Sequence, residues 1–250
     1  MSGVPVGDLA VVFGSGLSVV PDGVAVVDEL GYEELGWPVT GVTGHPSRLL
    51  VAVDRARSLR LLLACGRPHL YEGWDAEELA RPVRDLAAAG VRGVLLVNAA
   101  GGLSAACPPG TAVVATAVVD LQAAPPDEPA VLPLLPAATA ERLVTVLAAH
   151  LPAAAGRYVA VAGPQYETLA EAGWLATHGE VVGMSAAPEV RAAREAGVHV
   201  ALLALVVNRS ADATGHDEVL AAGARLTAGL KAVLSPLLSA LPFPDAEAPL

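Results

Sequence analysis

The side chains in this sequence that could do chemistry stand mainly where apolar segments end. The turn Gly14-Ser15-Gly16 follows one such segment. Its glycines let backbone N–H groups converge on an anion, and Ser15 adds a hydroxyl donor. An ordinary tight turn after a strand would contain the same residues. A dinucleotide fingerprint would need a third glycine where Val19 stands, so the turn does not predict a dinucleotide cofactor.

Arg67, His69 and Tyr71 alternate directly after another apolar run. In an extended segment alternate side chains point to the same side, which would bring a guanidinium, an imidazole and a phenol together. Such a trio suits a phosphate beside a sugar. A surface strand with amphipathic side chains is the alternative. Gly66 and Gly73, at either end of the segment, favour the binding site.

Small and polar residues end three further segments. Ala99 and Gly101 lie in a run of small residues that lets a ligand rest on the backbone, although close strand–helix packing needs the same residues. Met184 and Ser185 precede a predicted helix. They could cover a sugar and donate to phosphate, or serve as a core side chain and a helix cap. Asn208 ends the most apolar segment, where an amide is either a site residue or a turn former.

Tyr166 and Glu167 follow a Gly-Pro turn and suit a heterocyclic ring that carries an N–H group. Tyr166 offers an aromatic face, and Glu167 can accept a hydrogen bond. Glu167 could also stabilise the start of the next helix through its charge. His45 and His216 each follow a glycine, and alone each is as well explained by a structural, solvated or capping role.

Segments of strand and helix length position these residues. The strands that we expect from Val- and Leu-rich runs are Leu9–Phe13, Val24–Val27, Leu49–Val53, Leu59–Ala64, Val94–Val97, Ala112–Val119, Tyr158–Ala162 and Val200–Val207. The expected helices are Asp75–Ala89, Ala137–His150, Thr168–His178, Pro188–Ala196 and Asp217–Leu241. This alternation predicts a single α/β domain over residues 1–250, with a twisted, mixed central sheet flanked by helices. We expect a surface loop over Pro125–Pro136 and a loose tail over 242–250.

Composition narrows the class of partner. The 250 residues are 54% hydrophobic and 16% charged, with a net charge of −11 and scattered basic residues, so we expect neither a nucleic-acid nor a membrane partner. The start of the sequence lacks the basic residues of a signal peptide, and Val200–Val207 is too short to span a bilayer. Cys65 and Cys107 have no metal-site spacing and make no disulfide framework, so we expect no metal and a cytoplasmic location.

Taken in order, the motifs are more specific than any one of them. The sequence contains Gly-Ser-Gly-Leu, Gly-His, Gly-Arg-x-His-x-Tyr-Glu-Gly, Asn-Ala-Ala-Gly-Gly-Leu, Ala-Gly-Pro-x-Tyr-Glu-Thr, Gly-Met-Ser-x-x-Pro-Glu and His-x-Glu-Val-Leu. Together they resemble the trimeric purine nucleoside phosphorylase family, which includes the methylthioadenosine phosphorylases. The resemblance runs from about Leu9 to the last helix. It implies a nucleoside phosphorylase fold, inorganic phosphate as co-substrate without a cofactor, and a homotrimer whose subunits share the site.

The resemblance also implies a role for each matching residue. Phosphate contacts fall on Ser15, His45, Arg67, His69, Ala99 and Ser185. Ribose contacts fall on Tyr71, Met184 and His216. Base contacts fall on Tyr166, Glu167, Asn208 and Val219. His69, Glu167 and Asn208 are the expected catalytic residues, and an amide at Asn208 goes in the family with 6-oxopurines, so we expect inosine and guanosine as substrates in preference to adenosine.

Departures from the family pattern keep other functions open. Val207 and Ala186 stand where threonine is common, and the segments after Asp120 and Asn208 are short. Methylthioadenosine phosphorolysis is one alternative, although Asn208 and His216 do not suit a thioether nucleoside. A non-catalytic nucleoside- or phosphate-binding homologue is another, which the short loops favour. A dinucleotide-binding oxidoreductase is a third, and Val19 argues against it.

Overall fold

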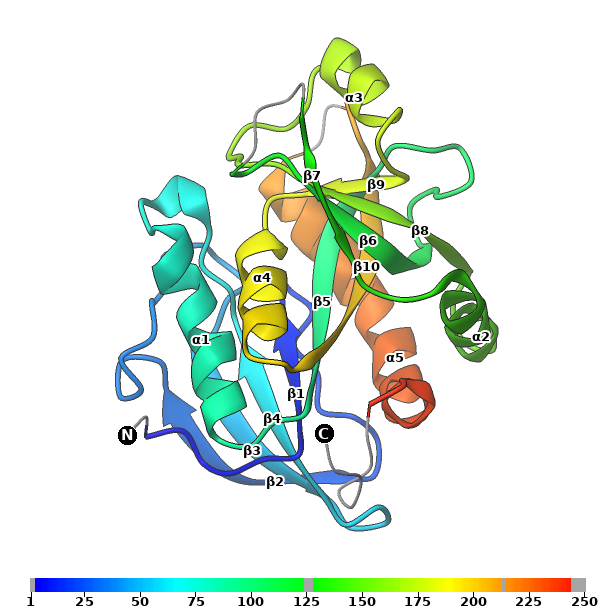
Figure 1. Cartoon of the computed structure of the whole chain (residues 1–250). Coiled ribbons are helices and arrows are strands. Elements are labelled where there is room, and N and C mark those ends of the chain that lie inside the picture. Colours follow the sequence, from blue (N-terminus) through cyan, green and yellow to red (C-terminus); the bar gives the residue numbers. More distant parts are fainter. Residues whose placement is uncertain (1–2, 124–127, 213–214, 244–250) are drawn as a thin grey trace.

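A mixed β-sheet forms the centre of the computed structural model, which describes residues 3–123, 128–212 and 215–243 (Figure 1). The expected twisted, mixed sheet flanked by helices is therefore confirmed. The strands are β1 (Leu9–Phe13), β2 (Val24–Gly31), β3 (Arg48–Asp54), β4 (Leu59–Cys65), β5 (Gly93–Gly102), β6 (Ala112–Asp120), β7 (Ala130–Pro133), β8 (Ala153–Ala160), β9 (Val181–Gly183) and β10 (His199–Arg209).

The sheet has an open half and a closed half. In the open half β5, β1 and β4 run parallel, and β3 and β2 follow as antiparallel neighbours at the edge. In the closed half β5 pairs with β10, β10 with β6, β6 with β8, β8 with β9, and β9 again with β5. Five strands therefore close into a ring, and β5 belongs to both halves.

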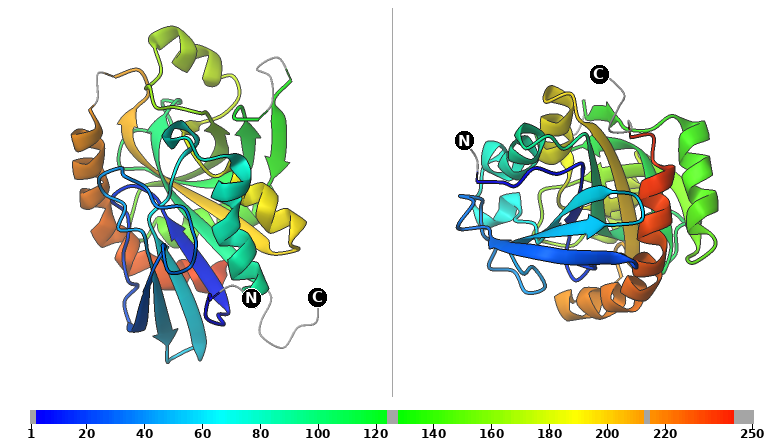
Figure 2. Two further views of the ribbon diagram at one scale, coloured as in Figure 1. Left: turned by 90° about the vertical axis from the view of Figure 1, so that its left-hand side faces the viewer. Right: turned by 90° about the horizontal axis from the view of Figure 1, so that it is seen from below.

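Helices cover both faces of the sheet (Figures 1 and 2). They are α1 (Ala76–Ala88), α2 (Ala137–Leu147), α3 (Leu169–Leu175), α4 (Ala187–Glu195) and α5 (His216–Ala240), with a 3-10 turn over Leu70–Glu72. Helices α1 and α4 pack on each other on one face, and α2 and α5 on the other. A capping box starts α1, because Asp75 accepts from the Glu78 N–H and Glu78 reaches back to the Asp75 backbone.

Strand β1 shows why the helices lie on both sides. Ala10 and Val12 join the core beneath α1 and α4, whereas Leu9, Val11 and Phe13 join the core beneath α2 and α5. Alternate residues of a strand point to opposite faces, so an apolar run without polar interruption is buried on both.

Two short strands correct the expected element pattern. The segment Pro125–Pro136 is not wholly a loop, because Ala130–Pro133 forms β7 and pairs with β6. Proline is tolerated there because β7 lies at an edge. The second is β9, whose three residues are too few for a hydrophobic pattern and are held as a strand by β5 and β8.

Three further expectations from the sequence are a loose tail over residues 242–250, two cysteines without a disulfide framework, and no segment that spans a bilayer. Phe243 packs against the core beside α5, and residues 244–250 of the expected tail lie outside the described residues. Cys65 and Cys107 are free and buried. In the described part of the chain, no helix is both long and apolar enough to cross a bilayer.

Parallel strands bring most of the candidate side chains to one edge of the sheet. Because β1, β4, β5 and β10 all run in the same direction, their carboxyl ends meet. Ser15 follows β1, Arg67 follows β4, and Asn208 lies near the end of β10. Ligands of open α/β sheets bind at this edge, in the crevice beyond the strand ends.

Candidate active site

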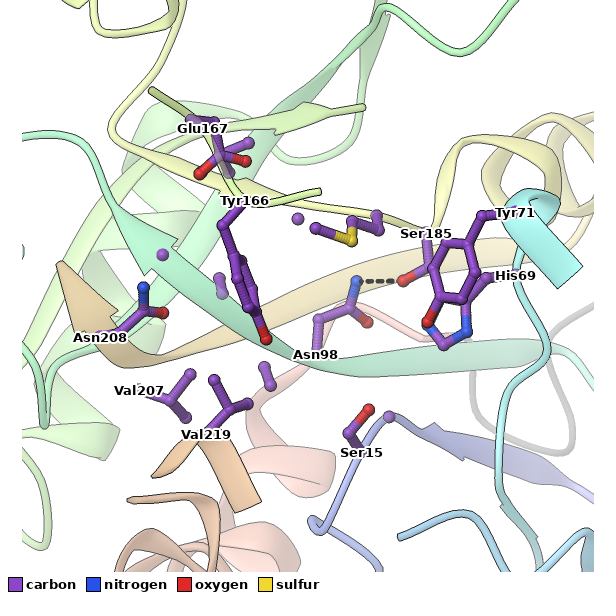
Figure 3. A pocket seen from close by; sticks show the side chains of 17 residues that line it. Ser15, His69, Tyr71, Asn98, Tyr166, Glu167, Ser185, Val207, Asn208 and Val219 are labelled. Carbon is purple, nitrogen blue, oxygen red and sulfur yellow. Dashed lines mark hydrogen bonds between the residues drawn. The ribbon is translucent and has the colours of Figure 1, made fainter. Parts of the chain in front are cut away.

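One pocket at the carboxyl ends of these strands collects most of the predicted residues (Figure 3). Those that line it are Ser15, His69, Tyr71, Ala99, Tyr166, Glu167, Met184, Ser185, Asn208 and Val219. The sequence analysis assigned no role to the other lining residues, which are Gly14, Asn98, Ala100, Gly101, Val182, Gly183 and Val207. His45 and Arg67 do not line the pocket but contact side chains that do.

His45 holds the hydroxyl of Ser15 from behind. The backbone N–H of Arg67 donates to His45 Nδ1 at 2.8 Å, and His45 Nε2 lies 2.7 Å from Ser15 Oγ. A backbone N–H can only donate, so Nδ1 is the acceptor and the ring proton is on Nε2. Nε2 therefore donates to Ser15 Oγ, which leaves the Ser15 proton for an acceptor in the pocket.

Arg67 lies in a buried polar network rather than on the pocket wall. Its Nε is 2.8 Å from Glu189 Oε1 in an ion pair whose two side chains are 3% and 6% exposed. Its guanidinium also donates to Val12 O at 3.1 Å and to Asn98 Oδ1. The expected alternation with His69 and Tyr71 is wrong beyond His69, because residues 70–72 form a 3-10 turn and not an extended segment.

Asn98 links this network to Ser185. With its carbonyl oxygen bound by Arg67, Asn98 donates from Nδ2 to the Tyr158 hydroxyl at 3.0 Å and to Ser185 Oγ at 3.2 Å. Arg67 Nη1 donates to the same Ser185 oxygen at 3.2 Å. Ser185 Oγ thus accepts two hydrogen bonds, and the buried Tyr158 hydroxyl is a further hydrogen-bond partner of the Ser185 side chain. Asn98 stands beside Ala99 in a run of small residues, and an amide at a buried strand end is the signal that could have identified it.

Glu72 orients His69 at the same end of the pocket. Its carboxylate accepts from the His69 backbone at 2.8 Å, lies 3.1 Å from His69 Nδ1, and accepts from Thr40 Oγ1 at 2.7 Å. Burial alone would raise the pKa of Glu72, but the hydrogen bonds from His69 and Thr40 outweigh it and lower the pKa. With Nδ1 held by Glu72, Nε2 is the imidazole atom left for a ligand.

Tyr71 and Met184 lie on the same side of the pocket, and both pack closely against Gly163. The Tyr71 ring stacks on His69 with centroids 4.7 Å apart and 12° between the planes. Burial raises the pKa of Tyr71 to about 12, so its phenol is neutral at ordinary pH. A β-carbon at Gly163 would lie 2.5 Å from Met184 Sδ and 2.9 Å from the Tyr71 ring. Gly163, at φ 71°, is therefore the residue that this close approach requires.

A β-bulge brings Val207 and Asn208 to the pocket together. The pairing of β10 with β5 shifts between Val206, opposite Ala100, and Asn208, opposite Gly101. In a regular strand two consecutive side chains would face opposite ways, whereas a bulge re-aims one of them. Asn208 Nδ2 donates to the carbonyl oxygen of Arg209 at 3.1 Å.

Glu167 and Tyr166 enter from the segment that precedes α3. Oε2 of Glu167 accepts from Ser210 Oγ at 2.7 Å, and the Tyr166 side chain points into the pocket (Figure 3). Thr168 caps α3 by accepting from the Glu171 N–H, and Glu167 lies one residue before this cap, where its charge can also stabilise the start of the helix. Because Thr168 supplies the cap, the Glu167 carboxylate is available to the pocket.

Helix α5 supplies the last two predicted residues. Val219 lines the pocket and is buried. His216 is the first residue of α5, but its side chain lies outside the part of the structure that is described.

The pocket thus has two ends of different chemistry (Figure 3). Ser15, Ser185 and His69 present hydroxyl and imidazole groups at one end, and Glu167 and Asn208 present a carboxylate and an amide toward the other. We name them the donor end and the amide end. The small residues of β5 between them leave backbone on which a ligand can rest. No group of three or more His, Cys, Asp or Glu side chains among the described residues could hold a metal ion.

Several known proteins are similar to this chain in sequence and in fold. Residues 52–239 match the model of the phosphorylase superfamily. The chain is 38% identical to the purine nucleoside phosphorylase of Mycobacterium tuberculosis over 240 residues, which cover 93% of this chain and 89% of that protein. It is 32% identical to purine nucleoside phosphorylase 1 of Bacillus subtilis over 241 residues, which cover 88% of each.

Solved structures agree with the sequence relatives. The purine nucleoside phosphorylase of Schistosoma mansoni in complex with adenosine has a TM-score of 0.78 and 28% identity, covering 96% of this chain and 93% of that one. The same comparison for its complex with inosine gives a TM-score of 0.75 and 28% identity, covering 95% and 92%. This chain therefore belongs to the phosphorylase superfamily and, within it, to the purine nucleoside phosphorylase family.

Proposed function

We propose that this chain cleaves the N-glycosidic bond of 6-oxopurine nucleosides with inorganic phosphate, releasing the base and ribose 1-phosphate. The observation that carries the proposal is a single pocket with hydroxyl and imidazole groups at one end and a carboxylate with an amide at the other. A nucleoside and a phosphate must meet in one cavity for this reaction, with phosphate on one side of C1′ and the base on the other.

The donor end suits the phosphate. Ser15 and Ser185 each accept hydrogen bonds from behind, so two hydroxyl groups are oriented before the anion arrives, and each can turn its proton toward a bound phosphate. His69 Nε2 adds a third group. Arg67, whose charge is balanced by Glu189, supports the phosphate end through its hydrogen bond to Ser185 from beneath the pocket surface. Bound phosphate is itself the nucleophile, so no serine or cysteine nucleophile is needed and positioning supplies much of the rate.

The amide end suits the departing purine. Cleavage leaves negative charge on the base, which donors aimed at that charge stabilise. Asn208 can hydrogen-bond the O6/N7 edge, and Glu167 can accept from N1–H. A 6-oxopurine carries a hydrogen on N1 and a 6-aminopurine does not, so a carboxylate at Glu167 supports inosine and guanosine over adenosine. Methylthioadenosine is also a 6-aminopurine nucleoside, and the same contact speaks against it.

Three further features of the proposal rest on the resemblance and on composition. We place the enzyme in the cytoplasm, as a homotrimer that needs no cofactor besides its co-substrate. Tyr166, Leu169 and Trp174, which are exposed apolar side chains around α3, support the contact of this region with a second subunit. A net charge of −11 supports small substrates and not nucleic acid.

The test is an incubation of the pure protein with inosine, guanosine or adenosine, each with and without phosphate, followed by chromatography of the free base. We expect base from inosine and guanosine only when phosphate is present. Release without phosphate would identify a hydrolase, and no release from any nucleoside would identify a binding protein. Asn208→Asp should gain adenosine turnover relative to inosine, whereas the matched surface variant Ser239→Ala should behave as the unchanged protein.

A further inference from the structure

Ser210 is a polar residue beside the pocket to which neither the sequence motifs nor the proposed reaction gives a role. It is 7% exposed, and its backbone N–H donates to Gly102 O at 2.9 Å, which anchors it to the end of β5. Its hydroxyl donates to Glu167 Oε2 at 2.7 Å. We propose that Ser210 is the positioning residue that holds the Glu167 carboxylate toward the base.

The end of β10 brings both base contacts close together. Asn208 lies in β10, and Ser210 is the first residue after the strand, held beside β5 by the hydrogen bond from its backbone N–H to Gly102 O. Asn208 lines the pocket itself, and Ser210 reaches Glu167 from the neighbouring position. Glu167 is 43 residues away in the chain, so this hydrogen bond ties the segment before α3 to the sheet.

The hydrogen bond from Ser210 affects base recognition, because it stops the Glu167 carboxylate from rotating. With Oε2 held by Ser210, Oε1 is the carboxylate oxygen left to accept from a base N–H, because Glu167 lines the pocket. Without the hydroxyl, Glu167 would have to be ordered by the substrate, and that ordering would weaken base binding. Ser210 therefore acts on the nucleoside and not on the phosphate. This inference rests on the proposed function.

The test compares Ser210→Ala with the unchanged protein, in the intact chain. Because a hydrogen bond to a charged group is lost, kcat/KM for inosine should fall about 10-fold through a higher KM for inosine. The KM for phosphate and the thermal unfolding midpoint should not change. Ser239→Ala, at an exposed serine whose hydroxyl donates to the Ser235 carbonyl, is the matched control and should behave as the unchanged protein.

A double-mutant cycle shows whether Ser210 acts through Glu167. In Glu167→Ala, the further change Ser210→Ala should leave kcat/KM unchanged, measured from first-order progress curves at high enzyme concentration. An effect that persists in that background overturns the inference, as does a change below 2-fold in the single variant or a parallel rise in the KM for phosphate. If the unchanged protein releases no base with phosphate, the proposed function itself fails, which is a distinct result.

Discussion

The two ends of the pocket are built in different ways. At the donor end the supporting side chains of Arg67 and Asn98 are 3% and 1% exposed, and each makes several hydrogen bonds or ion pairs. At the amide end Tyr166 is 38% exposed, and Glu167 is held by one hydrogen bond from Ser210. One end is a buried, densely hydrogen-bonded network, and the other combines the buried Asn208 with the more exposed Glu167 and Tyr166.

This contrast follows from what each end must do. A phosphate site gains from donors that are fixed before the anion arrives, because no reorganisation is then needed during the reaction. A base site must admit and release a large ring, which favours segments with few buried contacts. Substitutions at the donor end should therefore affect both folding and activity, whereas those at the amide end should affect activity alone.

The largest expected effect is at Arg67. Arg67→Met leaves Glu189 as an unpaired buried carboxylate, so the free energy of unfolding should fall by about 3–5 kcal/mol. Urea unfolding measures this change in the free energy of unfolding. The double variant Arg67→Met/Glu189→Leu should recover much of the loss, because neither charge remains. A loss below about 1 kcal/mol in the single variant would mean that the network is not what stabilises this end.

The amide end should respond in the opposite way to Asn208→Ala. We expect kcat/KM for inosine to fall about 100-fold or more, equivalent to about 3 kcal/mol of transition-state stabilisation. The free energy of unfolding should change by less than about 1 kcal/mol, because the side chain makes one hydrogen bond, to a neighbouring carbonyl. Steady-state kinetics and urea unfolding on the same preparation separate the two quantities. If Asn208→Ala lowered the free energy of unfolding as much as the transition-state stabilisation, the two ends of the pocket would not differ in this way.

A smaller effect at the donor end concerns Glu72 and pH. The pKa of Glu72 is lowered in the folded protein, so ionised Glu72 stabilises the fold above its unfolded-state pKa, and this contribution is lost as pH falls from about 4.5 through the folded value. The unfolding free energy of the unchanged protein should therefore exceed that of Glu72→Gln at pH 7, and the gap should narrow below pH 4.5. Glu33→Gln, at an exposed position, is the control. A gap that is independent of pH would contradict this assignment.

The smallest expected effect is at Tyr71, which stacks on His69 at the donor end (Figure 3). Because burial raises the pKa of Tyr71 to about 12, its phenol does not titrate in the working range of an enzyme. Tyr71→Phe should reduce kcat/KM by no more than about 10-fold, the value of one neutral hydrogen bond, and leave the shape of the pH–rate profile unchanged between about pH 6 and 10. An alkaline limb that disappears in Tyr71→Phe would show that the phenol ionises during turnover.

The sequence predicts the strands and helices better than the hydrogen bonds and ion pairs between the residues of the site. Leu9–Phe13 is a strand with the bounds that its apolar run predicts, because burial on both faces leaves a continuous signal. Ser15 and Asn208 could be placed at one edge of the sheet because β1 and β10 run the same way, whereas Glu167 follows β8, which runs the opposite way, and was assigned to the pocket only by the family motif. Glu189, Asn98 and Ser210 could not be connected to them, because these contacts join residues far apart in the chain. Asn98, an amide at the end of a buried apolar run, is the one of the three with a local signal in the sequence.

The most direct test of a single two-ended pocket is a crystal structure of this protein with sulfate, as a mimic of phosphate, and hypoxanthine. We predict sulfate within hydrogen-bond distance of Ser15 and Ser185, and hypoxanthine in the same cavity with N1–H donating to Glu167 and its O6/N7 edge at Asn208. Hypoxanthine in a cavity separate from the anion, or in this pocket without contact to Glu167 and Asn208, would contradict the account.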